Sequence, residues 1–390
     1  MSEENTKTYL EITSQKTALE ELLADIKTAQ QGYLPIWSTG FSKLDEKLDG
    51  GFLGGNLILL GAISSLGKTT FALQIAENIA ASGKDVLIFS LEMSKNELNA
   101  KSISRNTYRL TDSEKDYEKK SRQKYRLTMG DILRGRVGGF AFDQPTDDKG
   151  KLFLEAFAET QKASEHIFIL RDNNITVENV GEIVRTHIEA RPASKPFVII
   201  DYLQILKPSE SSKSGDKRLL TDEDVNNLKD LAVKLGLPIM VISSFNRASY
   251  LEPVNMGSFK ESGSIEYSSD TLIGLQYSGM QYQKHWFTKR SGKKTQVYES
   301  KIEHDTRVRL LAEKMDEDGA NGLFLPIDVV VLKNRGVSKG KLLFEFCPKY
   351  NIFKEKRDQN DDMYSWNHEE DEDESGASSV VSSTGSLGKV

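Results

Sequence analysis

Residues 57–70 read LILLGAISSLGKTT, an apolar run that enters a loop ending in Gly-Lys-Thr. Apolar residues then recur at helical spacing, namely Phe71, Ile75, Ala76 and Ile79. In the order strand, loop and helix, successive backbone N–H groups and the positive end of the helix converge on phosphate oxygens. We therefore predict a strand over 56–61, a helix over 69–81 and, between them, a loop that binds a nucleoside triphosphate.

The loop has the residue types that ATP and Mg²⁺ require, with one irregularity. Lys68 would reach the β- and γ-phosphates, and the Thr69 hydroxyl would ligate Mg²⁺. Ala62 stands where the usual spacing rule places the first glycine, and Gly61 precedes it. A Gly-Ser turn with a solvated lysine is the alternative, but the flanking strand and helix favour a phosphate loop. The predicted nucleotide contacts are Ala62, Ile63, Ser64, Ser65, Leu66, Gly67, Lys68, Thr69 and Thr70.

Length and composition allow one large α/β core with peripheral segments. The chain has 390 residues, of which 38% are hydrophobic. We find no apolar run long enough to span a membrane and no apolar signal peptide, so we expect a cytoplasmic protein. Cys347 is the single cysteine, which excludes a disulfide framework within one chain.

The excess negative charge lies entirely in the C-terminal segment. Residues 354–390 hold ten acidic and four basic residues, which accounts for the net charge of -6. This tail contains an acidic run at 369–374 and few apolar residues, so we expect it to be disordered. It is either a solubilising terminus or a peptide that competes for a basic groove or binds a partner.

Residues 37–353 alternate short β-rich runs with helical patterns, which is typical of a mostly parallel sheet flanked by helices. The last two strands should instead form an antiparallel hairpin at one edge. Ahead of this core, residues 1–36 are polar and contain an amphipathic helix over 14–31, packed on its own domain or on a neighbouring subunit. The predicted strands are 57–60, 86–90, 167–170, 197–201, 239–243, 271–275, 328–332 and 341–346.

Two segments interrupt the alternation. Residues 105–148 are highly charged and should be mostly helical before a Gly-rich loop. Residues 279–321 form a polar excursion with basic and aromatic residues interleaved over 284–294, as in proteins that bind single strands through phosphate contacts and base stacking. The excursion is either such a site or a charged surface hairpin. Its candidate DNA contacts are Lys289, Arg290, Lys293 and Lys294.

An aspartate ends one predicted strand and a glutamate follows another. Residues 197–201 read FVIID, which places Asp201 at the carboxyl edge of a buried strand beside the phosphate loop, where it would hold Mg²⁺ directly or through water. Glu92 follows the strand over 86–90, which we expect next to the phosphate-loop strand. A carboxylate there can orient and deprotonate the attacking water, although Glu92 alone also fits a solvated surface position.

Six segments, in order, resemble the ATPase domain of the DnaB-type replicative helicases, which has a RecA-like fold. They are the loop from Ala62 to Thr69, SLEM at 90–93, IDYLQ at 200–204, SSFNR at 243–247, ESGSIE at 261–266 and KNR at 333–335. The resemblance covers about residues 37–353. The short segment ahead of it has room for a linker-type helix but not for the N-terminal helical domain of many of these helicases, as in phage, plasmid and mobile-element versions.

The resemblance implies a ring-shaped, usually hexameric helicase that binds ATP and Mg²⁺ between subunits and moves on single-stranded DNA, with a primase or loader as partner. It implies that Lys333 and Arg335 reach the γ-phosphate held by the neighbouring subunit, and that Lys260 lies near the DNA-facing loops. Ser244 departs from the family, which usually has a glutamine there that senses the γ-phosphate. Its shorter side chain leaves sensing to be lost or taken over by Asn246 or Arg247.

Two other readings remain open from the sequence. One is a RecA/RadA- or KaiC-like ATPase that assembles without unwinding DNA, because the entry to the core, STGFSKLD at 38–45, is also similar to those proteins. The other is a nucleotide-switched replication accessory or loader protein with slow hydrolysis, which Ser244 and the acidic tail favour.

Overall fold

The structure is a computed structural model that describes residues 14–30, 35–113, 115–141, 144–172, 175–192, 194–203, 206–207, 217–259, 265, 267–288, 294–335 and 339–356. Residues up to Glu355 belong to one compact unit. Most of the acidic tail, and the candidate DNA contacts Lys260, Lys289, Arg290 and Lys293, lie outside the described residues. The fold and site below concern the described part alone.

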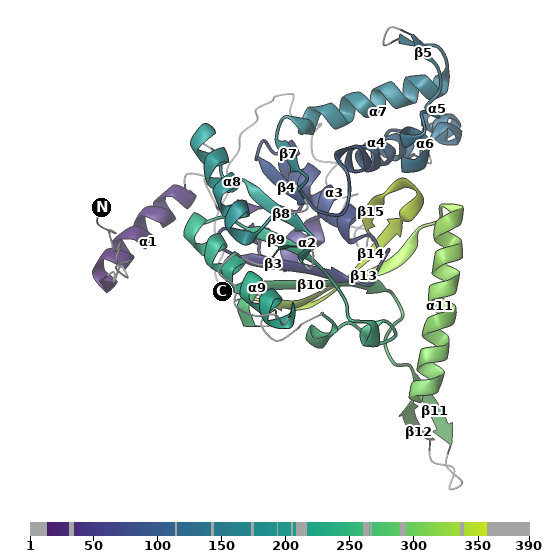
Figure 1. Ribbon diagram of the computed structural model, residues 1–390. Coiled ribbons are helices and arrows are strands. Elements are labelled where there is room, and N and C mark those ends of the chain that lie inside the picture. Colours follow the sequence, from purple (N-terminus) through teal and green to yellow (C-terminus); the bar gives the residue numbers. More distant parts are fainter. Residues whose placement is uncertain are drawn as a thin grey trace, which may run out of the picture. The chain divides into compact units, whose positions relative to one another are not determined.

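A nine-stranded sheet forms the centre of the protein (Figure 1). Six neighbouring strands pair in parallel, and the other three continue the sheet in antiparallel pairs, so the predicted parallel sheet with an antiparallel hairpin is confirmed. In spatial order the strands are β15 (Ile352–Glu355), β14 (Gly340–Cys347), β13 (Leu325–Asn334), β10 (Thr271–Tyr277), β3 (Leu57–Ala62), β9 (Ile239–Ser244), β8 (Phe197–Asp201), β4 (Val86–Ser90) and β7 (Ile167–Leu170).

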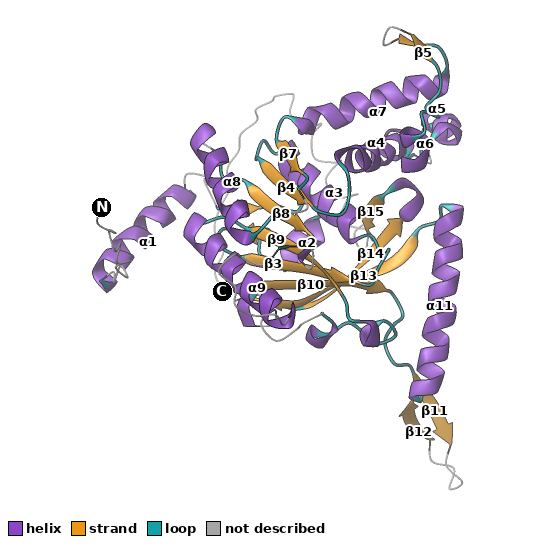
Figure 2. Ribbon diagram, viewed as in Figure 1, coloured by secondary structure: helices purple, strands orange, loops and turns teal. Residues whose placement is uncertain are grey.

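Helices cover both faces of this sheet (Figure 2). On one face α3 (Lys68–Ala81) packs with α4 (Lys95–Thr111) and α7 (Asp148–Ser164); on the other, α8 (Val177–Ala190) packs with α9 (Lys217–Leu235). Right-handed crossovers require this division, because the chain first moves outward from β3 to β4 and β7 and then returns to β8 and β9. Burial on both faces explains why the parallel strands are apolar throughout rather than alternating.

The strand order corrects one expectation. We expected the strand before Glu92 to lie next to the phosphate-loop strand, but β9 and β8 separate β4 from β3. The crossover through α3 leaves two positions open, and strands that come later in the chain fill them. Local apolar patterning identifies each strand and carries no information on which later strand is inserted between two earlier ones.

The excursion at 279–321 contains the hairpin that one of the two alternatives predicts, followed by a long helix that the sequence pattern did not indicate. Its elements are β11 (Lys284–Thr288), β12 (Lys294–Tyr298) and α11 (Lys301–Asn321), outside the central sheet (Figure 1). Arg307 of α11 holds the base of the hairpin in place. Its guanidinium donates to Glu299 Oε1 at 2.6 Å and to the Gly279 carbonyl at 2.6 Å. The hairpin is thus anchored at its base by a charged pair.

The predicted N-terminal helix is present as α1 (Gln15–Gln30). Its four apolar residues Leu19, Leu22, Leu23 and Ile26 are 58%, 52%, 52% and 44% exposed. The described residues leave this stripe largely exposed, so packing on its own domain and packing on a neighbouring subunit both stay predictions. None of the helices that the structure describes is both long and apolar enough to cross a membrane.

The remaining elements are short. The predicted helical character of the charged segment after Arg105 is confirmed by the last part of α4 and by two short helices ahead of the small strands at 140–145. The short elements of the whole described chain are β1 (Ile36–Trp37), α2 (Ser42–Lys47), β2 (Phe52–Leu53), α5 (Tyr117–Arg122), α6 (Met129–Leu133), β5 (Phe140–Ala141) and β6 (Gln144–Pro145).

Candidate nucleotide-binding site

A cavity of about 380 Å³ opens at the carboxyl ends of β3, β8 and β9. This is the edge at which open α/β sheets bind ligands, because the loops that leave parallel strands converge there. Most of the predicted nucleotide and catalytic residues line it, although they come from segments far apart in the chain. They include Ser64, Ser65, Gly67, Lys68, Thr69, Thr70, Glu92, Asp201 and Ser244.

The phosphate loop links β3 directly to α3, and its shape depends on a glycine. Gly67 has φ 86°, and a Cβ there would lie 2.7 Å from Phe346 Cζ, so no other residue fits without a shift. Gly67 is also the residue before the first turn of α3, and no side chain caps that turn. The first N–H groups of α3 therefore face the cavity without a capping partner, as an anion site requires.

Lys68 and Thr69 hydrogen-bond to groups at the wall of the cavity. The Lys68 ammonium donates to the carbonyls of Ala62 and Ile63 at 3.1 and 2.9 Å, inside its own loop. The Thr69 hydroxyl donates to Asp201 Oδ2 at 2.7 Å, which joins two predicted Mg²⁺ ligands. A hydroxyl and a carboxylate are hard oxygen donors, and Mg²⁺ commonly takes one or two such ligands and keeps its waters. These residues fit that ion.

The Asp201 carboxylate is buried, and its surroundings oppose its charge. Burial raises its pKa to about 6, with the nearby charge of Glu92 adding to the rise, while the Thr69 hydrogen bond and Lys68 oppose it. A buried carboxylate without a full cationic partner is costly. A divalent cation beside Thr69 and Asp201 would offset that cost, which supports the assignment of both side chains to Mg²⁺.

Glu92 and Ser244 line the same cavity from two further strands. Glu92 lies just beyond the end of β4 and its side chain is exposed. Ser244 ends β9, half-buried, and is the register partner of Ala62 at the end of β3. The strand that carries Glu92 is two positions farther from β3 than we expected, yet the carboxyl ends of the parallel strands still bring Glu92 to the cavity.

Asn246, one of the two alternatives for sensing the γ-phosphate, makes three side-chain hydrogen bonds in the structure. Its Oδ1 accepts from the N–H and the hydroxyl of Ser249 at 2.9 and 2.8 Å, and its Nδ2 donates to the Gly257 carbonyl at 2.8 Å. The carboxamide therefore holds two adjacent turns together. The alternative that Asn246 replaces the family glutamine requires breaking all three bonds.

Lys101 is a site residue that the sequence did not reveal. It lies on α4, and its ammonium donates to Thr70 Oγ1 at 3.1 Å and to Asn351 Oδ1 at 3.0 Å at the wall of the cavity. Burial, and after it the charge of Arg105, lowers the pKa of Lys101 to about 8, against the opposing effect of Asp201 and Glu97. The sequence feature that could have indicated this role is the position of Lys101, a cation two turns into the helix that follows Glu92.

Lys333 and Arg335 lie at the amino ends of the parallel strands, opposite the carboxyl ends that carry the cavity. Asn334 is the register partner of Thr271, which is in turn the partner of Ile58 near the start of β3. Arg335 is 59% exposed and pairs with Asp270 Oδ1 at 3.1 Å, while Lys333 donates to the Ser269 carbonyl at 2.6 Å. The structure therefore does not bring these two cations to the phosphate loop of the same chain.

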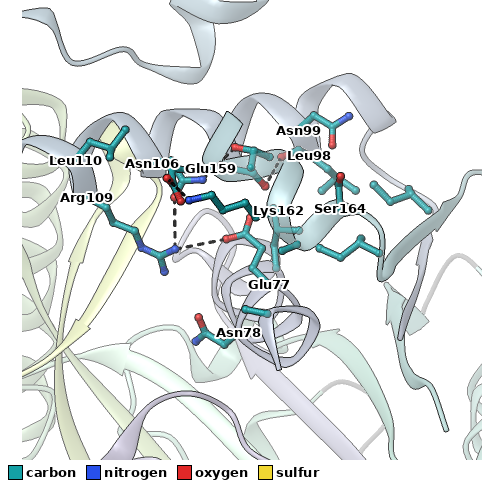
Figure 3. A pocket seen from close by; sticks show the side chains of 17 residues that line it. Glu77, Asn78, Leu98, Asn99, Asn106, Arg109, Leu110, Glu159, Lys162 and Ser164 are labelled. Carbon is teal, nitrogen blue, oxygen red and sulfur yellow. Dashed lines mark hydrogen bonds and ion pairs between the residues drawn. The ribbon is translucent and has the colours of Figure 1, made fainter. Parts of the chain in front are cut away.

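A second cavity, of about 520 Å³, lies between α3, α4 and α7 (Figure 3). Glu77 faces it and pairs with Arg109 at 4.0 Å and with the fully buried Arg105 at 3.0 Å. No predicted site residue lines this larger cavity. The chemistry of the phosphate loop, rather than cavity size, therefore identifies the nucleotide site.

Two relatives with similar sequences are both replicative DNA helicases. The replicative DNA helicase DnaB of Helicobacter pylori (strain ATCC 700392 / 26695) is 25% identical over 322 residues, which cover 81% of this chain and 59% of that protein. DnaB of Buchnera aphidicola subsp. Baizongia pistaciae is 30% identical over 260 residues, 64% of this chain and 48% of that protein. The chain thus spans about half the length of the relatives it matches.

Solved structures show the same fold. The ATPase domain of G40P superposes with a TM-score of 0.63 at 21% identity, covering 89% of this chain and all (100%) of that one. A DnaB-like replicative helicase, studied with its interactions with primase, gives a TM-score of 0.62 at 22% identity over 88% of this chain and 69% of that one. The DnaB-like helicase C terminal domain family matches residues 37–129 and 144–355. The chain belongs to the family of DnaB-like helicase C-terminal domains.

Proposed function

We propose that the protein is an ATP-dependent, ring-forming DNA helicase that hydrolyses ATP at subunit interfaces and moves on single-stranded DNA during replication. The observation that carries this proposal is the separation of the two halves of its ATP site. The phosphate loop follows the end of β3, whereas Arg335 follows a strand position paired with the start of β3. Six residues of β3 lie between the two edges. At about 3.3 Å per residue, that is on the order of 20 Å.

A second copy of the chain removes this separation. If the amino edge of one sheet faces the carboxyl edge of the next, Lys333 and Arg335 of one copy lie against the phosphate loop of its neighbour. Repeating that head-to-tail contact closes a ring when the rotation allows it. An arginine supplied in trans neutralises charge in the transition state and makes hydrolysis depend on subunit contact. A hexamer is the proposed ring.

In this proposal, the residues that line the cavity have separate roles in binding and hydrolysing ATP. Lys68 and the first N–H groups of α3 would hold the β- and γ-phosphates, and Thr69 and Asp201 would hold Mg²⁺, which supplies charge neutralisation at the phosphates. Glu92 would orient the attacking water and accept its proton. Lys101, whose ammonium reaches Thr70, adds a positive charge beside the phosphates.

The proposed partners are single-stranded DNA, further copies of the chain, and a primase or loader. Lys260 and the basic hairpin residues are the proposed DNA contacts. The exposed apolar stripe of α1 is a proposed subunit contact, because the residues that the structure describes leave its four apolar side chains largely uncovered. We propose the cytoplasm as the location, where replicating bacterial and phage DNA lies.

One observation favours a second candidate, an ATPase that assembles on DNA or with a partner without unwinding. Ser244 has a short side chain, and the Asn246 carboxamide is held by Ser249 and Gly257. Neither side chain then provides the amide that reports the γ-phosphate in the family pattern. Assays that measure DNA stimulation and unwinding separately distinguish the two functions.

ATP turnover should rise strongly with single-stranded DNA, and the protein should displace a strand from a forked duplex. Lys68→Ala removes the ammonium from the phosphates and should abolish nucleotide binding or turnover. Glu92→Gln keeps the shape of the side chain but not its basicity, so binding and assembly should persist while hydrolysis stops. Stimulation without unwinding supports the second candidate, and a slow rate unaffected by DNA contradicts both.

Arg335→Ala should be inactive alone and active when mixed with Lys68→Ala. Interfaces in the mixture pair an intact phosphate loop with an intact arginine, so ATPase activity should exceed the sum of the two separate variants. Arg309→Ala, which removes an exposed arginine of α11, is the matched control and should keep wild-type activity. Absence of rescue would show that Arg335 does not act across an interface.

Lys101→Met should weaken ATP binding about tenfold to a hundredfold, the usual worth of a hydrogen bond to a charged group. Because the pKa of Lys101 is lowered to about 8, the ammonium loses its proton as the pH rises above that value. Wild-type affinity should therefore fall above about pH 8, whereas Lys101→Arg should keep its affinity there.

The measurement is titration of a fluorescent ATP analogue across that pH range. Lys95→Met, at an exposed position of the same helix, is the control and should bind like wild type. Equal affinity of Lys101→Met and wild type at neutral pH would exclude Lys101 from phosphate binding.

Replacing the four basic hairpin residues with glutamine should weaken binding of single-stranded DNA and flatten its salt dependence. Each lost phosphate contact should reduce the slope of log affinity against log salt by about 0.7. The residues are Lys289, Arg290, Lys293 and Lys294. A control with glutamine at Lys115, Lys119, Lys120 and Arg122 changes the net charge equally. An equal loss of DNA affinity in both variants would show that the change in net charge causes the loss, and would contradict specific phosphate contacts at 289–294.

A further inference from the structure

The end of β13, which leads into Arg335, is held by the residues at the start of β10. The Lys333 ammonium donates to the Ser269 carbonyl at 2.6 Å. The Thr271 hydroxyl donates to Asn334 Oδ1 at 3.1 Å, and these two residues are also register partners. The backbone at 333–334 is therefore fixed to β10 before the chain reaches Arg335.

Arg335 is held at its backbone and at its side chain by a single residue, Asp270. The Arg335 N–H donates to the Asp270 carbonyl at 3.2 Å, and the guanidinium Nε pairs with Asp270 Oδ1 at 3.1 Å. The Asp270 side chain is 1% exposed, whereas that of Arg335 is 59% exposed. A buried carboxylate thus anchors one nitrogen of a guanidinium that stays accessible to solvent.

Asp270 is itself fixed by contacts that do not involve Arg335. Its Oδ2 accepts from the Leu57 N–H at 2.8 Å and from the Lys229 ammonium at 2.7 Å, and Lys229 also donates to the Gly55 carbonyl at 2.9 Å. The Asp270 N–H donates to the Leu57 carbonyl at 2.9 Å. Because Leu57 and Lys229 use one carboxylate oxygen, the carboxylate is oriented with its other oxygen toward Arg335.

The sharing of one carboxylate by two cations leaves Arg335 able to attract a further anion. Asp270 carries one negative charge against the positive charges of Lys229 and Arg335, so the three side chains together stay net positive. The ion pair engages Arg335 at Nε, which leaves Nη1 and Nη2 to bind two phosphate oxygens side by side. Contact with Asp270 and contact with phosphate therefore use different nitrogens of the same guanidinium.

We infer that Asp270 is a positioning residue for Arg335, which it holds by Nε with the two Nη groups presented to an anion of a neighbouring subunit. The inference rests on the proposed function in taking that anion to be the γ-phosphate in the neighbour. A solvated arginine side chain loses rotamer freedom when it binds phosphate. One that is anchored at Nε has lost part of that freedom beforehand, so less is lost on the way to the transition state.

Asp270→Asn tests the inference, because asparagine keeps the size of the side chain and one oxygen for Leu57 and Lys229 but presents no second anionic oxygen to Arg335. The kcat for ATP hydrolysis should fall about tenfold to a hundredfold, as for a misplaced catalytic group. The KM for ATP should stay within about twofold, because the phosphate loop of the same subunit is unchanged.

Asp328→Asn is the matched control. Asp328 is a fully buried (0% exposed) aspartate of β13 that pairs with Lys341 at 3.2 Å, and it should keep the wild-type kcat when replaced. A kcat of Asp270→Asn equal to that of the control overturns the inference. A kcat above wild type also overturns it, because Asp270 would then restrain Arg335 instead of positioning it.

Mixing variants separates positioning from loss of the fold. Asp270→Asn should regain activity with Lys68→Ala, whose intact Arg335 meets the intact phosphate loop of the other variant. It should not regain activity with Arg335→Ala, because every interface then lacks a positioned arginine. Activity in that second mixture would show that Asp270 acts apart from Arg335. If circular dichroism shows Asp270→Asn to be unfolded, Asp270→Glu, which keeps the charge on a longer side chain, takes its place in every measurement.

Urea unfolding keeps the inference separate from the proposed helicase function. Arg335→Ala should lower the unfolding midpoint of wild type by more than it lowers that of Asp270→Asn, because the contact it removes needs the carboxylate. If Arg335→Ala hydrolyses ATP like wild type while this cycle is non-additive, the trans arginine of the proposed function fails and the anchoring by Asp270 stands. If the cycle is additive, the inference fails whatever the ATPase activities are.

Discussion

The common direction of the six parallel strands is the constraint on which the rest of this structure depends. A buried parallel sheet places the carboxyl ends of all its strands at one edge, so residues from β3, β4, β8 and β9 meet there although they are distant in sequence. The same direction sends the antiparallel β13 back to the amino edge, where Arg335 follows its end. In the proposed ring, one sheet would carry two chemically complementary edges, and a complete site would need two copies.

A buried aspartate lies at each of these edges, and the two carboxylates have different electrostatic surroundings. At the carboxyl edge Asp201 has the Thr69 hydroxyl at 2.7 Å, and burial raises its pKa to about 6, so it favours a cation. At the amino edge Asp270 accepts from the Leu57 N–H at 2.8 Å and pairs with Lys229 at 2.7 Å and with Arg335 at 3.1 Å. Arg335 thus shares this carboxylate with Lys229, and its own side chain is 59% exposed.

Sequence reasoning identified what local patterns encode. Apolar runs located the strands of the parallel sheet, and the phosphate loop with Asp201 and Glu92 located the cavity, because each depends on residues close together in the chain. The strand order was missed because pairing is a long-range property. Lys101 was missed because its role depends on α4 lying against Thr70, and the hydrogen bonds of Asn246 depend on turns that no periodicity marks.

The irregular spacing of the phosphate loop has a physical explanation in the structure. In the usual rule the first glycine stands at the position of Ala62. The glycine one residue earlier is Gly61, and a Cβ there would lie 2.3 Å from Phe259 Cε1 and 2.5 Å from Phe245 Cε1. Its missing Cβ lets the rings approach the backbone of β3 just before the loop. The glycine that stands one residue early is therefore required by the packing of these two rings on β3.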